Sequence, residues 1–246
     1  MKRIISIVMC ALICFTVLSG CDPSEYLRNR DGSVIGVGDL ETFEYKVGNY
    51  SEVRVELQCD INYYSARSDT IKLEIQPNLH EFIVVEKNNG TLIIRANVSI
   101  LFTGKSPILT ISMPGLLSLS HAGAGVITTH DVIRSDSFNL SLEGAGSGKI
   151  NLATSNLTAN MTGAGNYELI GSADSAVYSM SGAGKLDAMA LQTRTAKVNF
   201  NGSGIFKVNC TDNLTITASG VGTVEYKGSP TLTLVKNGLV IVKKVD

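Results

Sequence analysis

The residues best suited to chemistry are two histidines with a neighbouring carboxylate and one glycine-rich stretch. His121, and His130 followed by Asp131, could form an acid–base or metal-binding pair if one turn of the fold brought them together. Gly144-Ala-Gly-Ser-Gly148 has the composition of a phosphate loop, but it lacks the Lys-Ser/Thr that normally follows and a helix to supply a dipole. We therefore expect surface histidines and structural glycines, and we predict no catalytic residue, no cofactor and no metal site.

A set of outward-facing polar residues is the other candidate site. Glu168, Asp187 and Glu225 share one position after a glycine turn, and Asn151 and Lys207 stand at the same level of their own repeats. Such a ladder could contact a sugar or a cation. Carbohydrate-active enzymes need clustered carboxylates in a groove, whereas these acids are scattered. We therefore interpret the ladder as a solvated face of mixed charge.

The N-terminus has the organisation of an export signal. Met1-Lys2-Arg3 is a short basic segment, and residues 4–17 are an apolar run too short to cross a bilayer as a stable helix. The run ends in Leu18-Ser19-Gly20-Cys21, which resembles the lipobox of bacterial lipoproteins. Small residues before Cys21 suit the peptidase, and its thiol would take the diacylglycerol. We expect residues 1–20 to be a cleaved lipoprotein signal peptide and Cys21 to be the lipidation site that anchors the chain to a membrane.

Two further cysteines lie outside the signal segment. Cys59 and Cys210 each fall on the apolar side of an alternating run, so both are expected to point into the core of a β-structure. Buried free thiols are the favoured interpretation. A disulfide between the two stays open, because an oxidising envelope would permit it.

The composition bounds the class of protein. The chain has 246 residues, with 21 Lys and Arg against 22 Asp and Glu, which gives a net charge of −1. A nucleic-acid-binding protein would need a basic surface, so we expect no nucleic-acid partner. The hydrophobic fraction of 44% indicates a folded chain rather than a disordered one.

The sequence divides into three parts after the signal. Residues 21–42 are polar and are predicted to be a flexible tether between the lipid and the domain. Residues 43–118 contain short alternating runs with turn signals such as Asn88-Asn89-Gly90, which predict strands and a hairpin. No segment keeps helical periodicity over three turns, so the fold class is all-β.

Residues 119–240 are an internal repeat of about 19 residues with a Gly-x-Gly turn in each copy. Apolar residues alternate with polar residues on both sides of each turn, which is typical of strands with one buried face. Stacked units of this kind predict a parallel β-helix, with glycine at a corner where a Cβ would clash. A sandwich of 19-residue hairpins remains the alternative. The repeated turn glycines are Gly144, Gly146, Gly163, Gly165, Gly182, Gly184, Gly202, Gly204, Gly220 and Gly222.

These repeats resemble the head GIN domain family (DUF2807), a domain of unknown function labelled as an auto-transporter adhesin head and common in lipoproteins of Bacteroidetes. Gly146-Ser-Gly-Lys-Ile-Asn-Leu152 carries the repeated pattern, and Ser106-Pro-Ile-Leu-Thr-Ile-Ser-Met-Pro114 precedes the first copy in the usual order. The resemblance covers residues 43–240. It implies a right-handed parallel β-helix-like solenoid and no activity. His121 departs from the pattern, because glycine is expected at its position.

We therefore expect a non-enzymatic, adhesin-like or structural protein of the cell envelope, anchored through lipid at the outer membrane on its surface or its periplasmic face. Its partner would be a glycan or a protein. Two alternatives remain: a carbohydrate-active enzyme on a β-helix, and a periplasmic envelope-assembly factor.

Overall fold

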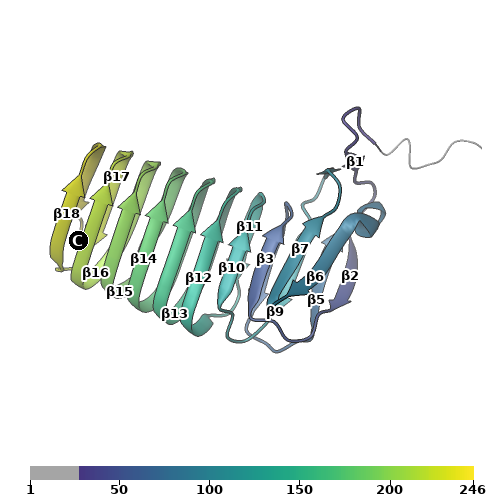
Figure 1. Cartoon of the computed structure of the whole chain (residues 1–246), viewed down its shortest axis with the longest axis horizontal. Helices are drawn as coiled ribbons and strands as arrows, with labels where there is room; N and C mark the ends of the chain where they lie inside the picture. The colour runs from purple at the N-terminus through teal and green to yellow at the C-terminus, as the bar shows by residue number, and fades with distance from the viewer. Residues whose placement is uncertain (1–27) are drawn as a thin grey trace, which may run out of the picture.

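The computed structural model describes residues 28–246, which are almost entirely β-structure. The chain winds into a β-solenoid of about seven turns with a repeat of ~19 residues (Figure 1). Neighbouring repeats pair in parallel along their whole length, as β13 (Ala145–Met161) does with β14 (Ala164–Met180). The expected parallel β-solenoid is therefore confirmed, and the hairpin sandwich is excluded because its neighbouring strands would pair antiparallel.

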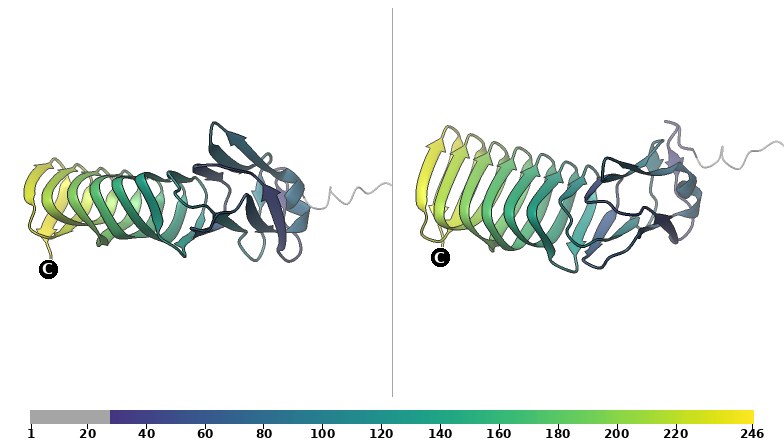
Figure 2. Two further views of the ribbon diagram at one scale, coloured as in Figure 1. Left: turned by 90° about the horizontal axis from the view of Figure 1, so that it is seen from below. Right: turned by 60° about the horizontal axis from the view of Figure 1, so that its bottom comes forward.

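Each turn of the solenoid contributes to two sheets that face one another (Figure 2). Besides β13 and β14, the strands of this part are β10 (Ser118–His121), β11 (Gly125–Thr129), β12 (Ile133–Leu142), β15 (Ala183–Phe200), β16 (Ser203–Ala218), β17 (Val221–Lys227), β18 (Thr231–Lys236) and β19 (Leu239–Lys244). The first sheet contains β10, β12, the second halves of β13 to β16, and β18; the second sheet contains β11, the first halves of β13 to β16, β17 and β19.

The core lies between the two sheets because the apolar residues alternate with polar ones along both. In β13, Ile150 and Leu152 point inward from the second sheet and Leu157 points inward from the first, and all three are buried. Larger rings fill the later turns: the rings of Tyr178 and Phe206 meet edge to face, with their centroids 5.3 Å apart. Stacked turns thus form one continuous core that no single repeat could bury alone.

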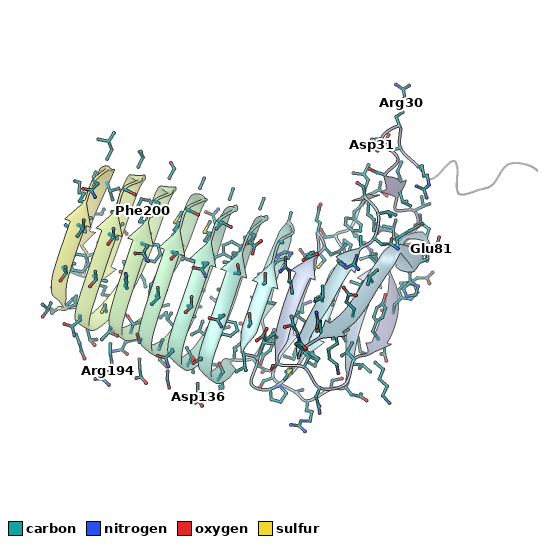
Figure 3. All side chains as sticks on the ribbon, viewed as in Figure 1. Arg30, Asp31, Glu81, Asp136, Arg194 and Phe200 are labelled. Carbon is teal, nitrogen blue, oxygen red and sulfur yellow. The ribbon has the colours of Figure 1, made fainter. Side chains whose placement is uncertain are left out.

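The ten repeat glycines lie at one corner of the solenoid, in columns that run from turn to turn. A Cβ on Gly163 would overlap the carbonyl oxygen of Gly144 in the preceding turn, so the backbone itself occupies the space of a side chain. Gly184 would meet Gly165 in the same way and also has a φ of +127°, which non-glycine residues rarely adopt. The opposite corner is polar, and Figure 3 shows Asp136 and Arg194 projecting from it.

The N-terminal strands extend the solenoid out of chain order. β3 (Glu52–Glu56) lies between β10 and β7 (Thr91–Ala96), and β4 (Asp60–Tyr64) lies between β11 and β9 (Ile108–Ser112), all in parallel. This end is covered by β2 (Glu41–Lys46), β5 (Thr70–Ile75), the 3₁₀ helix η2 (Pro77–Phe82) and β6 (Ile83–Asn88). The covering strands are antiparallel, because β5 pairs with β9 and β6 pairs with β7.

The structure also revises the predicted tether. Of residues 21–42, those from 28 onward are described, and Val34 is buried in the core. β1 (Val34–Ile35) pairs in parallel with β8 (Ile100–Leu101), and the Val34 N–H donates to the Ser99 carbonyl at 2.9 Å. The second half of the predicted tether therefore belongs to the folded domain, since its few apolar residues find partners there. Residues 1–27, which include the predicted signal peptide and Cys21, lie outside the described residues.

Candidate functional site

The outer face of the second sheet carries one charged side chain per turn at a shared register position. We call this set the charged row; its members are Lys149, Glu168, Asp187, Lys207, Glu225 and Lys243. The row exists because the residue next to an inward-pointing residue points outward on a strand, and parallel pairing stacks equivalent positions about 4.8 Å apart.

Ion pairs connect neighbouring members of the charged row. Lys149 Nζ lies 3.7 Å from a Glu168 carboxylate oxygen. Glu225 is held from both sides, by Lys207 at 2.8 Å and by Lys243 at 3.0 Å. Neighbouring members of the row have opposite signs except for Glu168 and Asp187, and there Lys185 pairs with Asp187 at 2.7 Å. Most of the charge is thus neutralised locally.

The ion pairs change the proton affinity of the row. Hydrogen bonds from Lys207 and then Lys243 hold the pKa of Glu225 below its usual value, and the bond to Glu225 raises the pKa of Lys207. For Asp187, partial burial raises the pKa, but bonds from Lys185 and the Met189 N–H outweigh it, so the net shift is downward. These carboxylates are therefore held in the ionised form, which is the reverse of what a general acid needs.

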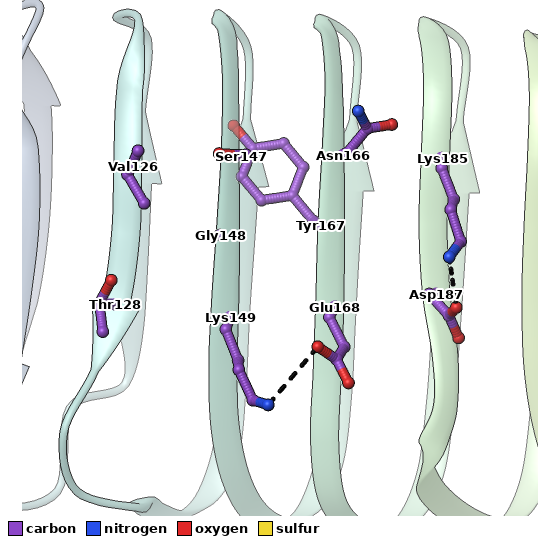
Figure 4. A pocket seen from close by; sticks show the side chains of 10 residues that line it. All are labelled: Val126, Thr128, Ser147, Gly148, Lys149, Asn166, Tyr167, Glu168, Lys185 and Asp187. Carbon is purple, nitrogen blue, oxygen red and sulfur yellow. Dashed lines mark ion pairs between the residues drawn. The ribbon is translucent and has the colours of Figure 1, made fainter.

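A shallow depression of about 490 Å³ opens beside the N-terminal part of the charged row (Figure 4). Lys149 and Glu168 form one ion pair in it, and Lys185 forms a second with Asp187 at 2.7 Å. The depression combines ammonium, carboxylate, amide and hydroxyl groups on one rigid face. Its lining residues are Val126, Thr128, Ser147, Gly148, Lys149, Asn166, Tyr167, Glu168, Lys185 and Asp187.

The predicted polar ladder is only partly correct. Glu168, Asp187, Lys207 and Glu225 do share one row, but Lys149 and not Asn151 precedes Glu168 in it. Asn151 lies two residues after Lys149, at the next outward position of the strand, where its Nδ2 donates to the Thr129 carbonyl at 3.1 Å. The error arose because Gly148, a residue without a side chain, occupies an inward position of this repeat that the other copies fill with a large residue.

The histidines are not brought together as a catalytic pair. His121 is buried, in register with the inward-pointing Leu142, and burial lowers its pKa. The expectations that it lies on the surface and that it replaces a turn glycine are both wrong, because Gly123 and Gly125 stack on Gly144 and Gly146. His130 is outside the core, where it stacks on Tyr64 with ring centroids 4.6 Å apart. Among residues 28–246, no three His, Cys, Asp or Glu side chains are grouped to hold a metal ion.

Cys59 and Cys210 are buried free thiols, which confirms the favoured prediction from the sequence. Cys59 lies in the N-terminal rungs and Cys210 in β16. Burial raises the pKa of both thiols, so neither is a reactive nucleophile. Along the described part of the chain, no helix is long and apolar enough to cross a membrane.

Comparisons with known proteins agree with this architecture. The family model described as "Putative auto-transporter adhesin, head GIN domain" (DUF2807) matches residues 49–230. A "putative adhesin" from Bacteroides fragilis is 25% identical, with a TM-score of 0.81 over 87% of this chain and 100% of that chain. A "putative lipid binding protein" from Parabacteroides distasonis is 24% identical, with a TM-score of 0.68 over the same shares of the two chains. No curated protein matches the chain.

Proposed function

Because the chain belongs to the head GIN domain family, we propose that it is a lipid-anchored, non-enzymatic protein of the cell envelope that presents its solenoid as an adhesin-like binding surface. Membership of a family described as an adhesin head supports the adhesin-like role, and the lipobox ending at Cys21 supports the anchor. The proposed location is the outer membrane.

The observation that carries this proposal is the position of the anchored end. The described chain begins beside the N-terminal rungs, and the solenoid runs from there to the C-terminus at its far end (Figure 1). Six residues separate Cys21 from Arg28, a reach of at most about 25 Å when fully extended. A lipid on Cys21 would therefore hold one end of the rod close to the membrane and direct the other end away from it.

The depression beside the charged row supports a polar partner. Carboxylate, amide and ammonium groups on neighbouring turns can donate to and accept from the hydroxyl groups of a sugar. The lowered pKa of Asp187 and of Glu225 argues against either residue acting as the general acid of a glycoside hydrolase, because that role needs a carboxyl group with a raised pKa. We propose a glycan as the first partner to test at this face.

Protease shaving of intact cells tests the location and the anchor. The wild-type domain is expected to be digested while a periplasmic marker survives. A Cys21→Ala variant is expected to lose its membrane attachment in fractionated cells. If the domain is protected until the outer membrane is opened, the adhesin-like role is wrong and the periplasmic envelope-assembly role replaces it.

A further inference from the structure

The C-terminal end of the solenoid is open in the part of the chain that the structure describes. Within residues 28–246, β18 is paired along one edge, with β16, and β19 along one edge, with β17. Leu232 and Leu234 point inward in register with Leu214 and Ile216, which are fully buried, yet they are 37% and 43% exposed. The last turn therefore presents unpaired backbone groups and an uncovered section of the core, which is the arrangement that invites another strand to pair.

The glycine corner at this end is also unusually apolar. In the preceding turns the residue between the two glycines is small: Ala145, Ala164, Ala183 and then Ser203. In the last two turns the same position holds Val221 and Leu239, which are 55% and 81% exposed. Ile241, on the outer face of β19, is 62% exposed. Large apolar side chains are not expected at a corner that faces only solvent. Their clustering at one end of the solenoid therefore indicates a contact surface.

The opposite end of the solenoid differs from this one. There β5 and β6 pair antiparallel with the last parallel strands and β2 pairs antiparallel with β5, so the edges at that end belong to β2 and β6 rather than to a parallel rung. A head-to-tail contact would join two unlike ends and continue into a filament. A contact between two C-terminal ends uses each surface once and closes after two copies.

From these features we infer that the C-terminal end of the solenoid binds the same end of a second copy of this chain. β18 and β19, the two strands with an unpaired edge, lie on opposite sheets and run in opposite directions. A single peptide strand would pair with only one of them. A second copy related by a twofold axis supplies two antiparallel strands with the required spacing between sheets.

Charge at the two corners favours the same occupant. Lys236 ends β18 at the glycine corner, whereas Asp246 follows β19 at the polar corner. Lys244 Nζ lies 3.2 Å from Ser229 Oγ, which places the end of β19 beside the start of β18. If β18 pairs antiparallel with β18 of a second copy, Lys236 of each copy lies at the corner that carries Asp246 of the other. Lys243 also lies near that corner, but its charge is already paired with that of Glu225.

The consequence for function rests on the proposed lipid anchor. With Cys21 near one end and the pairing surface at the other, two paired copies point their anchors in opposite directions. Each copy has about eight strand spacings between its outermost parallel rungs, or about 40 Å. Such a pair would join two facing membranes rather than two neighbours on one membrane.

Sedimentation of the chain from residue 22 to 246, which contains every buried core residue, tests the pairing. We expect a monomer–dimer equilibrium for the wild type, and at least tenfold weaker dimerisation for the Leu239→Asp/Ile241→Asp double variant. Val126→Asp is the matched control, because Val126 lies in the same outer row as Ile241, six strands further from the open end, and is 44% exposed. A monomeric wild type, or equal effects of Val126→Asp and the double variant, would overturn the inference. Melting temperatures show whether each variant is folded.

Fluorescence transfer between copies tests the orientation. Cys59 and Cys210 are buried, so a maleimide dye will label an added surface cysteine selectively. Copies labelled at Lys227→Cys near the open end should show transfer, and copies labelled at Asp31→Cys should show none. Transfer at Asp31→Cys would indicate side-by-side association and contradict the inference. These measurements use no membrane, so their failure leaves the proposed anchoring and location untouched, and a failed shaving experiment leaves the pairing untouched.

Discussion

Gly148 lies in register with Tyr167 of the next turn, and the ring of Tyr167 occupies the space beside it that a side chain would fill. A Cβ on Gly148 would stand 3.2 Å from the ring and only 2.8 Å from the Ile127 carbonyl oxygen. Tyr167 is itself 3% exposed, so one turn provides the ring and the previous turn provides the gap. Adjacent repeats in this solenoid are therefore complementary rather than interchangeable.

Tyr167→Ala is expected to destabilise the domain by about 3 kcal/mol, because it leaves a large cavity over two glycines that cannot fill it. The midpoint of urea unfolding measures this loss. Val126→Ala, on the exposed outer face two turns before Tyr167, is the control and should change the free energy of unfolding by less than about 0.5 kcal/mol. Equal effects of the two substitutions would show that the ring does not pack against Gly148.

Gly163→Ala is expected to cost more than its single methyl group suggests. The added Cβ would overlap the carbonyl oxygen of Gly144, and a backbone atom within a stack of parallel strands cannot move away without shifting the neighbouring turns. We expect a loss of at least about 2 kcal/mol in the free energy of unfolding, measured by urea titration. Ala164→Ser at the neighbouring exposed corner position serves as the control and should be nearly neutral.

Much of the fold could be predicted because the glycine spacing, the alternation and the turn positions all report the same repeat. The turn at Asn89-Gly90, where both φ angles are positive, was predictable from the same local chemistry. The register at the first repeat was not, because His121-Ala-Gly123 and Gly123-Ala-Gly125 both fit the pattern. Which of the two registers forms depends on Leu57 and Cys59. Their carbonyl groups lie against Gly123 and Gly125, although these residues are more than 60 positions apart in the chain.

The candidate site was predictable to the same extent. Four of the five predicted ladder residues share a row, since parallel pairing stacks whatever follows the corner. Lys149 is not predicted because the first large apolar residues after the two glycine turns are Ile150 and Tyr167, which suggests that they lie opposite each other, whereas Ile150 pairs with Leu169. The open end was visible in the sequence only as a last degenerate repeat. Its exposed edges became apparent once the pairing of β18 and β19 was known.

The thiol chemistry of the chain gives a separate prediction. In the chain from residue 22 to 246, Cys59 and Cys210 are the two remaining thiols, and both are buried with raised pKa values. A colorimetric disulfide reagent is expected to detect none of them in the native protein at pH 8 and both of them in denaturant. If the denatured chain showed no free thiol without a reductant, the two cysteines would be joined in a disulfide.

Glu225 links the charged row to the stability of the domain as pH changes. Its pKa is depressed in the folded state, so its ionised form stabilises the fold fully above the unfolded pKa near 4.5, and this contribution is lost as the pH falls through the lower folded value. Glu225→Gln is therefore expected to lower the melting temperature at pH 7 and to have little effect at pH 2. Since ion pairs at a surface contribute modestly, the difference at pH 7 should not exceed about 3 °C and should shrink in 1 M salt. Glu41→Gln is the matched control, because Glu41 is exposed on β2, outside the charged row. If Glu225→Gln and Glu41→Gln gave the same dependence on pH and salt, Lys207 and Lys243 would not be holding Glu225 in its ionised form.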